Sequence, residues 1–240
     1  QVGCDYYCSY CIIPYLRGSS RSRNFDSCIQ EARALDKNGY REIVLTGINI
    51  GTYQHKDRKL VDLILGLLDK TNLDRIRISS IEPDLVSDEL IRLMKNEKRL
   101  CRHLHIPLQH GSDKILKKMN RRYTSQEYKN LIEKIASEIP EICLGTDIMT
   151  GFPGEGEQEF EEMYKNFHEM PVVHYHVFRY SPRPGTRAYD FSDQVHSKTA
   201  KERAKRLRKL GKSKKEKFVS HYNGQKVEVL AEQIDENNIL

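Results

Sequence analysis

The 240-residue sequence has no apolar run near the length of a membrane span and no signal peptide, which argues against a bilayer-crossing helix. Its cysteines are also not spaced as the pairs of a disulfide framework would be. Three of its six cysteines fall within eight residues, and Cys28, Cys101 and Cys143 stand singly in apolar patterns. Three clustered cysteines cannot pair evenly, so the thiols indicate a reducing, cytoplasmic compartment. The first residue is Gln1, and we expect the chain to be part of a longer protein.

The clustered cysteines are Cys4, Cys8 and Cys11, spaced C-x3-C-x2-C, with Tyr10 directly before the third. A tetrahedral zinc site normally takes four protein ligands, and no fourth cysteine or histidine is nearby. Each iron of a [4Fe-4S] cluster needs an outer ligand, so three cysteines would leave one iron open to a substrate or cofactor. The spacing favours an iron–sulfur site. A zinc knuckle with a remote fourth ligand stays open as the alternative.

The charge of the chain is concentrated in one segment. Residues 197–217 carry eleven Lys/Arg and two Glu, a local charge of +9, which leaves −3 for the remainder of a chain of net charge +6. Such asymmetry indicates a polyanionic partner at one end of the molecule. A solvated amphipathic helix explains the same composition, and charge alone does not separate the two.

Apolar strands alternate with amphipathic helices along most of the chain. Strands are predicted at 42–45, 75–79, 103–108, 142–149 and 172–178, with helices between them. Capping patterns mark the helix starts at Ser27/Gln30, Ser87, Thr124/Glu127 and Thr199/Glu202. Alternation of this kind predicts an α/β fold with parallel strands and right-handed crossovers. Counting a stub before Cys4, about six units form a partial (β/α)6 TIM-like barrel.

Three parts follow from this pattern. Residues 1–196 are the barrel core with a truncated first strand, 197–222 a basic helix or linker, and 223–240 the start of a β domain whose first strand covers 226–232. Polar and glycine-rich stretches follow the carboxyl ends of the core strands, where α/β folds bind ligands. The residues expected to converge on one mouth with the cysteine loop are Thr46, Gly47, Glu82, Gln109, Asp147, Arg179 and Tyr180.

The cysteine spacing with its tyrosine resembles that of the radical S-adenosylmethionine (SAM) enzymes. The resemblance implies that Cys4, Cys8 and Cys11 hold a [4Fe-4S] cluster whose fourth iron is chelated by SAM. The reduced cluster then cleaves SAM to a 5′-deoxyadenosyl radical, which takes hydrogen from the substrate.

The match narrows to the methylthiotransferase branch over the segments 11–18, 21–23, 109–113, 119–121, 145–148, 151–155 and 180–186. The strand at 226–232 is similar to the start of a TRAM domain, a small RNA-binding β-barrel. Segments 45–51 and 79–83 most resemble the enzymes that act on N6-threonylcarbamoyladenosine, 3′ of the anticodon at position 37 of tRNA. Isopentenyl-adenosine in tRNA is the runner-up substrate, and an aspartate of a ribosomal protein is the third.

The resemblance also implies roles by position. Tyr10 packs near the adenine of SAM, and Thr46 and Gly47 lie where its amino group is held. Ribose contacts are assigned to Gln109, Ser112 and Asp147, and adenine or substrate contacts to Arg179 and Tyr180. No residue beyond the cluster and SAM is required as a catalytic group. The implied partners are the tRNA anticodon stem-loop and an electron donor such as flavodoxin or ferredoxin, and no sequence feature sets an oligomeric state.

One departure separates the chain from the branch. Members carry an N-terminal domain with three further cysteines and a second [4Fe-4S] cluster that supplies or carries sulfur, and Cys28, Cys101 and Cys143 have the wrong spacing for it. We therefore predict that this chain binds SAM but does not complete sulfur insertion. A hypothesis of another class is a nucleic-acid-binding module with structural zinc in the cysteine loop.

Overall fold

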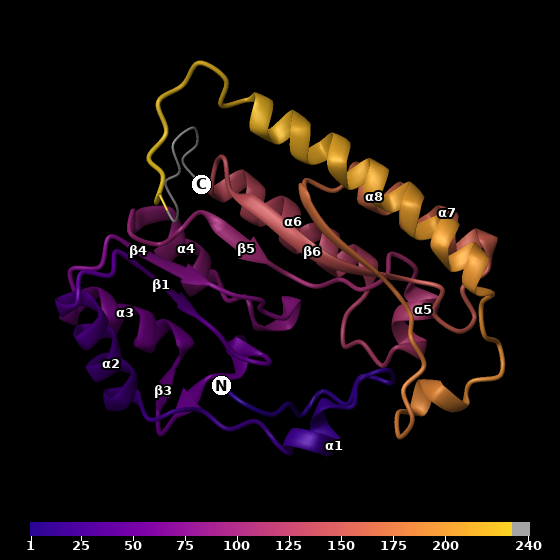
Figure 1. The fold of residues 1–240 in the computed structure, drawn as a ribbon, viewed down its shortest axis with the longest axis horizontal. Coiled ribbons are helices and arrows are strands. Elements are labelled where there is room, and N and C mark those ends of the chain that lie inside the picture. Colours follow the sequence, from indigo (N-terminus) through magenta and orange to yellow (C-terminus); the bar gives the residue numbers. More distant parts are fainter. Residues whose placement is uncertain (232–240) are drawn as a thin grey trace.

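Five parallel strands form the centre of the structure, a computed structural model that describes residues 1–231 (Figure 1). They are β1 (Glu42–Leu45), β4 (Arg75–Ile78), β5 (His103–His105), β6 (Cys143–Thr150) and β7 (His174–Arg179). β1 pairs with β4, and β6 pairs with both β5 and β7. The bridges Ile76–Leu100 and Ser80–His105 connect these two sets, so the strands follow one another in chain order. The predicted α/β class is therefore confirmed.

Helices precede β1, fill the connections between the strands of the sheet, and follow β7. They are α1 (Ile13–Arg17), α2 (Phe25–Lys37), α3 (Leu60–Lys70), α4 (Asp88–Asn96), α5 (Asp113–Lys118), α6 (Ser125–Glu138), α7 (Glu157–Glu169) and α8 (Ser197–Ser220). A short hairpin, β2 (Gln54–His55) with β3 (Arg58–Lys59), precedes α3, and 3₁₀ turns lie at Ile50–Thr52, Pro83–Leu85 and Arg187–Asp190. Among residues 1–231, none of these helices is long and apolar enough to cross a bilayer.

The apolar core lies between the sheet and the helices. Successive side chains of a strand point to opposite faces, and one face of each strand is apolar. Ile76 of β4 and Leu144 and Ile148 of β6 are closed to solvent in one cluster that also contains Ile132 and Phe160. The opposite, inner face of these strands carries mostly polar side chains. In a complete TIM barrel the interior is filled with bulky apolar residues, so this inner face is available for a ligand instead.

Local capping explains where the helices begin. The Thr124/Glu127 capping box of α6 is confirmed, and Ser87 caps α4 by accepting from the Leu90 amide. The boxes predicted at 27/30 and 199/202 are wrong. An earlier acceptor caps each helix: Asn24 accepts from the Ser27 amide before α2, and His196 accepts from the Lys198 amide before α8.

Among residues 1–231 the barrel is not closed, and neither the predicted N-terminal strand nor the described part of the predicted strand at 226–232 forms. No strand pairs β7 with β1 within residues 1–231, so the sheet is open and has five strands, not six. The predicted N-terminal stub is too short for a ladder: Val2 forms one antiparallel bridge with Arg21, and the Gln1 carbonyl accepts from the Ile48 amide. Residues 226–231 are exposed and form no strand, because no described segment pairs with them, and 232–240 lie outside the described residues.

The basic segment forms α8, which packs along β7 beside α7 (Figure 1). Leu207 and Leu210 are buried, and Gly211 lets the helix approach closely, since a Cβ there would lie 2.9 Å from the Tyr175 side chain. Lys214 donates to carbonyls at the C-terminal end of α7, including that of Met170 at 2.6 Å. The thin apolar stripe of α8 therefore covers the sheet, and most of its lysines face solvent.

Candidate functional site

The cysteine loop is held at the mouth of the sheet by backbone contacts. The Cys4 amide donates to the Gly18 carbonyl at 3.2 Å, and the Cys11 amide donates to the Cys8 carbonyl at 3.0 Å, which closes a turn between the second and third thiols. Gly3 has a φ of +77°, and a Cβ there would overlap the Ser19 carbonyl, so the entry to the loop requires glycine. The three thiols are free and partly buried.

Arg121 is the main polar contact of this loop and was predicted only as part of a motif. Its guanidinium is 2% exposed, donates to the Cys8 Sγ at 3.2 Å and forms an ion pair with Glu82. It also donates to the Tyr123 hydroxyl. Burial raises the pKa of Glu82, and the charge of Arg121 opposes the rise. A charged donor on a cysteine sulfur stabilises the thiolate form that a metal cluster needs.

The donor set fits a three-cysteine iron–sulfur cluster. Burial raises the pKa of the Cys4 and Cys11 thiols, so each must lose a proton when metal binds. Three thiols are too few for a closed tetrahedral zinc site and suit a [4Fe-4S] cluster with one open iron. The other cysteines lie elsewhere: Cys28 on α2, and Cys101 and Cys143 at the amino ends of β5 and β6.

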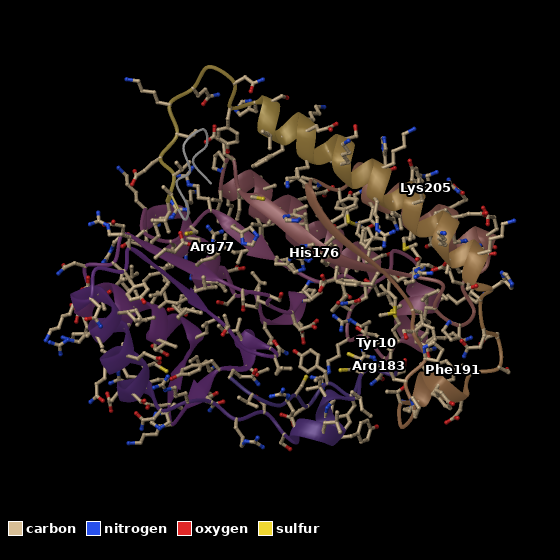
Figure 2. All side chains as sticks on the ribbon, viewed as in Figure 1. Tyr10, Arg77, His176, Arg183, Phe191 and Lys205 are labelled. Atoms are coloured by element: carbon tan, nitrogen blue, oxygen red, sulfur yellow. The ribbon has the colours of Figure 1, made fainter. Side chains whose placement is uncertain are left out.

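An aromatic cluster borders the loop. The Tyr10 and Phe152 rings meet edge to face with centroids 6.3 Å apart, and Phe152 meets Tyr180 in the same way at 5.2 Å. Phe191 packs on the same cluster, and Figure 2 shows it with Tyr10 and Arg183 near one end of the sheet. The Tyr180 hydroxyl is buried without a hydrogen-bond partner among the described residues. A buried unpaired hydroxyl suits a ligand that brings its own polar atom.

The predicted strand-end residues divide between the two sides of the mouth. Thr46, which is exposed, and Gly47 follow β1 at one edge of the open sheet, while Arg179 and Tyr180 end β7 at the other. Arg179 and Tyr180 line a cleft that Arg208 of α8 also borders. The two groups therefore lie at the carboxyl ends of strands on opposite edges of the sheet.

Gln109, Asp147 and Ser112 lie between those edges. The Gln109 amide donates to the Asp147 carbonyl at 2.9 Å, and Gln109 adopts a φ of +74°, so its backbone is fixed against β6. Asp147 points from β6 to the inner face, where its carboxylate is within electrostatic reach of Glu82. Ser112 is 2% exposed, and its carbonyl accepts from the first turn of α5.

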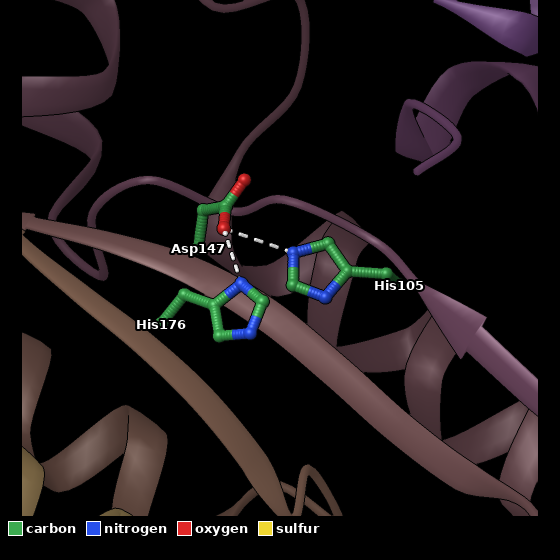
Figure 3. Close-up of side chains that lie close together, drawn as sticks. All are labelled: His105, Asp147 and His176. Carbon is green, nitrogen blue, oxygen red and sulfur yellow. Dashed lines mark hydrogen bonds and ion pairs between the residues drawn. The ribbon is translucent and has the colours of Figure 1, made fainter. Parts of the chain in front are cut away.

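Sequence reasoning missed a group of histidines on the inner face. His105 Nε2 lies 2.9 Å and His176 Nδ1 3.4 Å from the same Asp147 Oδ1 (Figure 3). The two imidazole rings are 4.8 Å apart between centroids. The ligand atoms of the three residues lie within 4.8 Å of one another, which also makes them a possible metal-ligand set. The signal in the sequence was the repeated H-x-H at 103–105 and 174–176, since alternate strand residues share a face.

This geometry, three thiols in one loop at the mouth of a parallel α/β sheet, agrees with the family comparison. Residues 1–167 match the radical SAM superfamily, and the chain belongs to that superfamily. A structural relative is the coproporphyrinogen III oxidase of Escherichia coli, described as a radical SAM enzyme. Its TM-score is 0.68 at 16% identity, over 89% of this chain and 51% of that one, which supports the fold alone.

Curated relatives are similar across nearly the whole chain. A tRNA-2-methylthio-N(6)-dimethylallyladenosine synthase of Endomicrobium trichonymphae is 41% identical, over 97% of this chain and 56% of that protein. A threonylcarbamoyladenosine tRNA methylthiotransferase of Chlamydia pneumoniae is 38% identical, over 98% and 56%. The chain thus spans about half the length of these relatives. Most of the similar proteins carry the dimethylallyl name, so identity does not support the predicted threonylcarbamoyl branch over the isopentenyl-type one.

Proposed function

We propose that this chain is the radical SAM part of a tRNA methylthiotransferase that modifies C2 of N6-threonylcarbamoyladenosine at position 37. The observation that carries the proposal is the cysteine loop, with three thiols and the Arg121 contact to Cys8. The names of the 38–42% identical relatives support tRNA methylthiolation. Dimethylallyladenosine in tRNA is the second candidate substrate, supported by the names of most of those relatives, and a ribosomal-protein aspartate is the third.

The chain's own residues would hold the cofactors as follows. Cys4, Cys8 and Cys11 ligate the cluster, which when reduced supplies the electron that breaks a carbon–sulfur bond of SAM. The guanidinium of Arg121 and the carboxylate of Glu82 are complementary to the carboxylate and ammonium of an amino acid, and they adjoin Cys8.

The other assignments remain proposals that the placement of the residues supports. Thr46 and Gly47 serve the amino-acid end of SAM, and Tyr10 its adenine. The ribose contacts are Gln109, Ser112 and Asp147, and Arg179 and Tyr180 contact adenine or substrate. The free hydroxyl of Tyr180 and the inward carboxylate of Asp147 are the strongest of these, because each offers an accessible or unpaired polar atom.

The basic helix is proposed to face tRNA. Lys201, Lys205, Lys209 and Lys212 are exposed and recur at helical spacing on α8, and Figure 2 shows Lys205 on that helix. Lysines on one face can contact successive phosphates. We divide the protein into a core at 1–196, this basic helix at 197–222 and an RNA-binding domain beginning at 223–240, the last on resemblance alone.

Further parts of the proposal concern the complete enzyme. A second [4Fe-4S] cluster would supply or carry sulfur, and this chain by itself is expected not to insert it. A flavodoxin or ferredoxin would supply electrons. A tRNA substrate and free thiols support a cytoplasmic enzyme.

Nucleoside analysis of tRNA from cells that lack the full-length protein tests the substrate. We expect loss of the methylthio group from N6-threonylcarbamoyladenosine alone. Loss only from dimethylallyladenosine would establish the second candidate, and retention of both marks would contradict tRNA methylthiolation.

A further inference from the structure

The face of the open sheet that points away from the helices is lined mostly by polar side chains. The alternation that buries Leu104, Leu144 and Ile148 turns their neighbours inward. The inward positions on the four strands after β1 include Arg75, Arg77, His103, His105, Asp147, His174 and His176. The apolar inward side chains are Val44 and Phe178, each about half exposed, on the edge strands β1 and β7, and Cys143 and Met149 at the two ends of β6. Between those ends the inner face is lined by hydrogen-bonding groups.

Asp147 fixes the most exposed of these histidines. His176 Nδ1 faces the Asp147 carboxylate, and the ring also packs against those of His105 and His174, with centroids 4.8 Å from each. The side chain is nevertheless 47% exposed. Its Nε2 is the ring nitrogen left for a ligand. It accepts from a hydroxyl or N–H when the ring is neutral and donates to a carboxylate when the ring is protonated.

Gly145 keeps space open between the histidines. It pairs with His105 on one side and His174 on the other, in the middle of the polar face. A Cβ at this position would lie 2.7 Å from His105 Nδ1, so a larger residue would displace that ring.

Two guanidinium groups of the polar face share a carboxylate near the histidines. Glu42 accepts from both Arg75 and Arg77, at 2.6 and 2.7 Å, so two guanidinium groups share one carboxylate. Burial and the charge of Arg77 together lower the pKa of His103 to about 4. The Arg77 guanidinium has further N–H donors besides the one that Glu42 accepts, and these can donate to a ligand carboxylate.

The histidines also lie next to the cofactor residues. Asp147, which orients His176, is within electrostatic reach of Glu82, and Glu82 is paired with the guanidinium that contacts Cys8. A substrate group held at His176 is thus beside the region where the radical forms. This is the region where a modified base must be placed.

We propose that this inner face, with His176 and Arg77 as the contacting residues, binds the polar N6 substituent of threonylcarbamoyladenosine and selects against a dimethylallyl group. The inference rests on the proposed function and names the residues that choose its substrate. The threonylcarbamoyl group brings a carboxylate, a hydroxyl and a urea, which can replace the water hydrogen bonds of imidazole and guanidinium groups. A hydrocarbon would remove that water without replacing it, which carries a free-energy penalty. Asp147 and His105 act as positioning residues for His176.

The test measures direct binding of free nucleosides to this chain by calorimetry under anaerobic conditions. The ligands are N6-threonylcarbamoyladenosine, its methyl ester, which lacks the carboxylate charge, and N6-dimethylallyladenosine. We expect the acid to bind about tenfold more tightly than either other ligand, since it alone brings a charged acceptor for the N–H groups of His176 and Arg77. His176→Phe and Arg77→Met should each remove most of that preference. The matched control His168→Phe, on the exposed face of α7, should keep it.

Three results would overturn the inference: equal binding of the three nucleosides, a preference that His176→Phe leaves intact, or a preference that appears only with added Zn²⁺ and disappears with chelator. The last would assign His105, Asp147 and His176 to a metal ion instead. Circular dichroism melting of each variant separates loss of binding from loss of folding. The binding test can fail while the tRNA analysis still shows loss of the methylthio group from N6-threonylcarbamoyladenosine. That outcome would refute the role assigned to His176 and Arg77 and would leave the proposed function standing.

Discussion

At the scale of single residues, Arg121 connects the cysteine loop to the strand ends. Its guanidinium contacts Cys8, Glu82, Tyr123 and the Pro107 carbonyl while remaining almost closed to solvent. Buried ion pairs of this kind are costly to break, because the remaining partner keeps its desolvation penalty. The three cysteines, by contrast, could be proposed as cluster ligands from their spacing in the sequence.

Removing the Arg121 charge should destabilise the fold as well as the cluster site. We expect Arg121→Met to lower the free energy of unfolding by about 3–5 kcal/mol, because Glu82 is then buried without its partner. Urea unfolding measures the change. The double variant Arg121→Met/Glu82→Leu should recover much of the loss, and a single variant within about 1 kcal/mol of the wild type would show that the pair is not buried as described.

The shifted pKa of His103 predicts a pH dependence. Its folded pKa is about 4, lowered first by burial and then by Arg77, His105, His174 and His176, against 6.5 for an ordinary histidine. Between these values the unfolded chain binds the proton and the folded chain does not, so stability falls as the pH falls from 6.5 toward 4. His103→Gln removes this contribution. The urea midpoint should therefore drop less between pH 7 and pH 5 in the variant than in the wild type, and equal drops would contradict the shift.

At the scale of elements, α8 is attached to the sheet by a buried ion pair as well as by its apolar stripe. Arg203 donates to the Glu155 carboxylate and carbonyl, both at 2.8 Å, and the Glu155 side chain is fully buried. Glu155 also accepts from the Gly151 amide at 2.9 Å. The loop after β6 and the first half of α8 are therefore one connected unit.

Arg203→Met should weaken that unit, lowering the free energy of unfolding by about 3–5 kcal/mol. In the variant, hydrogen exchange should accelerate more at the amides of α8 than at those of β6, each compared with the wild type. Arg206→Met is the matched control, since its pair with Glu161 is about half exposed and contributes at most about 1 kcal/mol. Equal effects of the two substitutions would refute a specific role for the buried pair.

The helices and strands were predicted from the sequence more accurately than the contacts between them. Apolar runs such as Glu42–Leu45 and the Thr124 capping box are local signals, and the structure reproduces both. The contacts of Arg121 and the meeting of His105, Asp147 and His176 join residues far apart in the chain. Loop packing brings Arg121 to Cys8, and strand register brings the histidines to Asp147. Periodicity could place a strand residue on a face but could not identify any of these partners. The part of the predicted 226–232 strand that the structure describes, 226–231, forms no strand, because a strand needs a neighbour and alternation does not supply one.

At the scale of the whole molecule, two surfaces of different character lie on opposite sides of the sheet. The inner face is polar and open, and the helix face carries the apolar core and the lysines of α8. Such a division agrees with the proposals that the inner face binds the base and that α8 contacts the phosphates.

Charge reversal on α8 tests the proposed contact with the phosphate backbone of tRNA. The triple variant Lys201→Glu/Lys205→Glu/Lys209→Glu should weaken binding of an anticodon stem-loop and reduce the slope of log affinity against log salt by about 0.7–0.9 per lost phosphate contact. Lys95→Glu, exposed on α4, is the control and should change neither quantity. An unchanged salt slope in the triple variant would show that α8 does not face RNA.

The most direct test of the central claim is anaerobic reconstitution of this chain with iron and sulfide, followed by reduction in the presence of SAM. A [4Fe-4S] cluster on Cys4, Cys8 and Cys11 predicts a broad brown absorbance and formation of 5′-deoxyadenosine, both lost when any of these cysteines is replaced by alanine. A colourless protein that holds stoichiometric zinc, which iron and sulfide cannot replace, and that leaves SAM intact would contradict it.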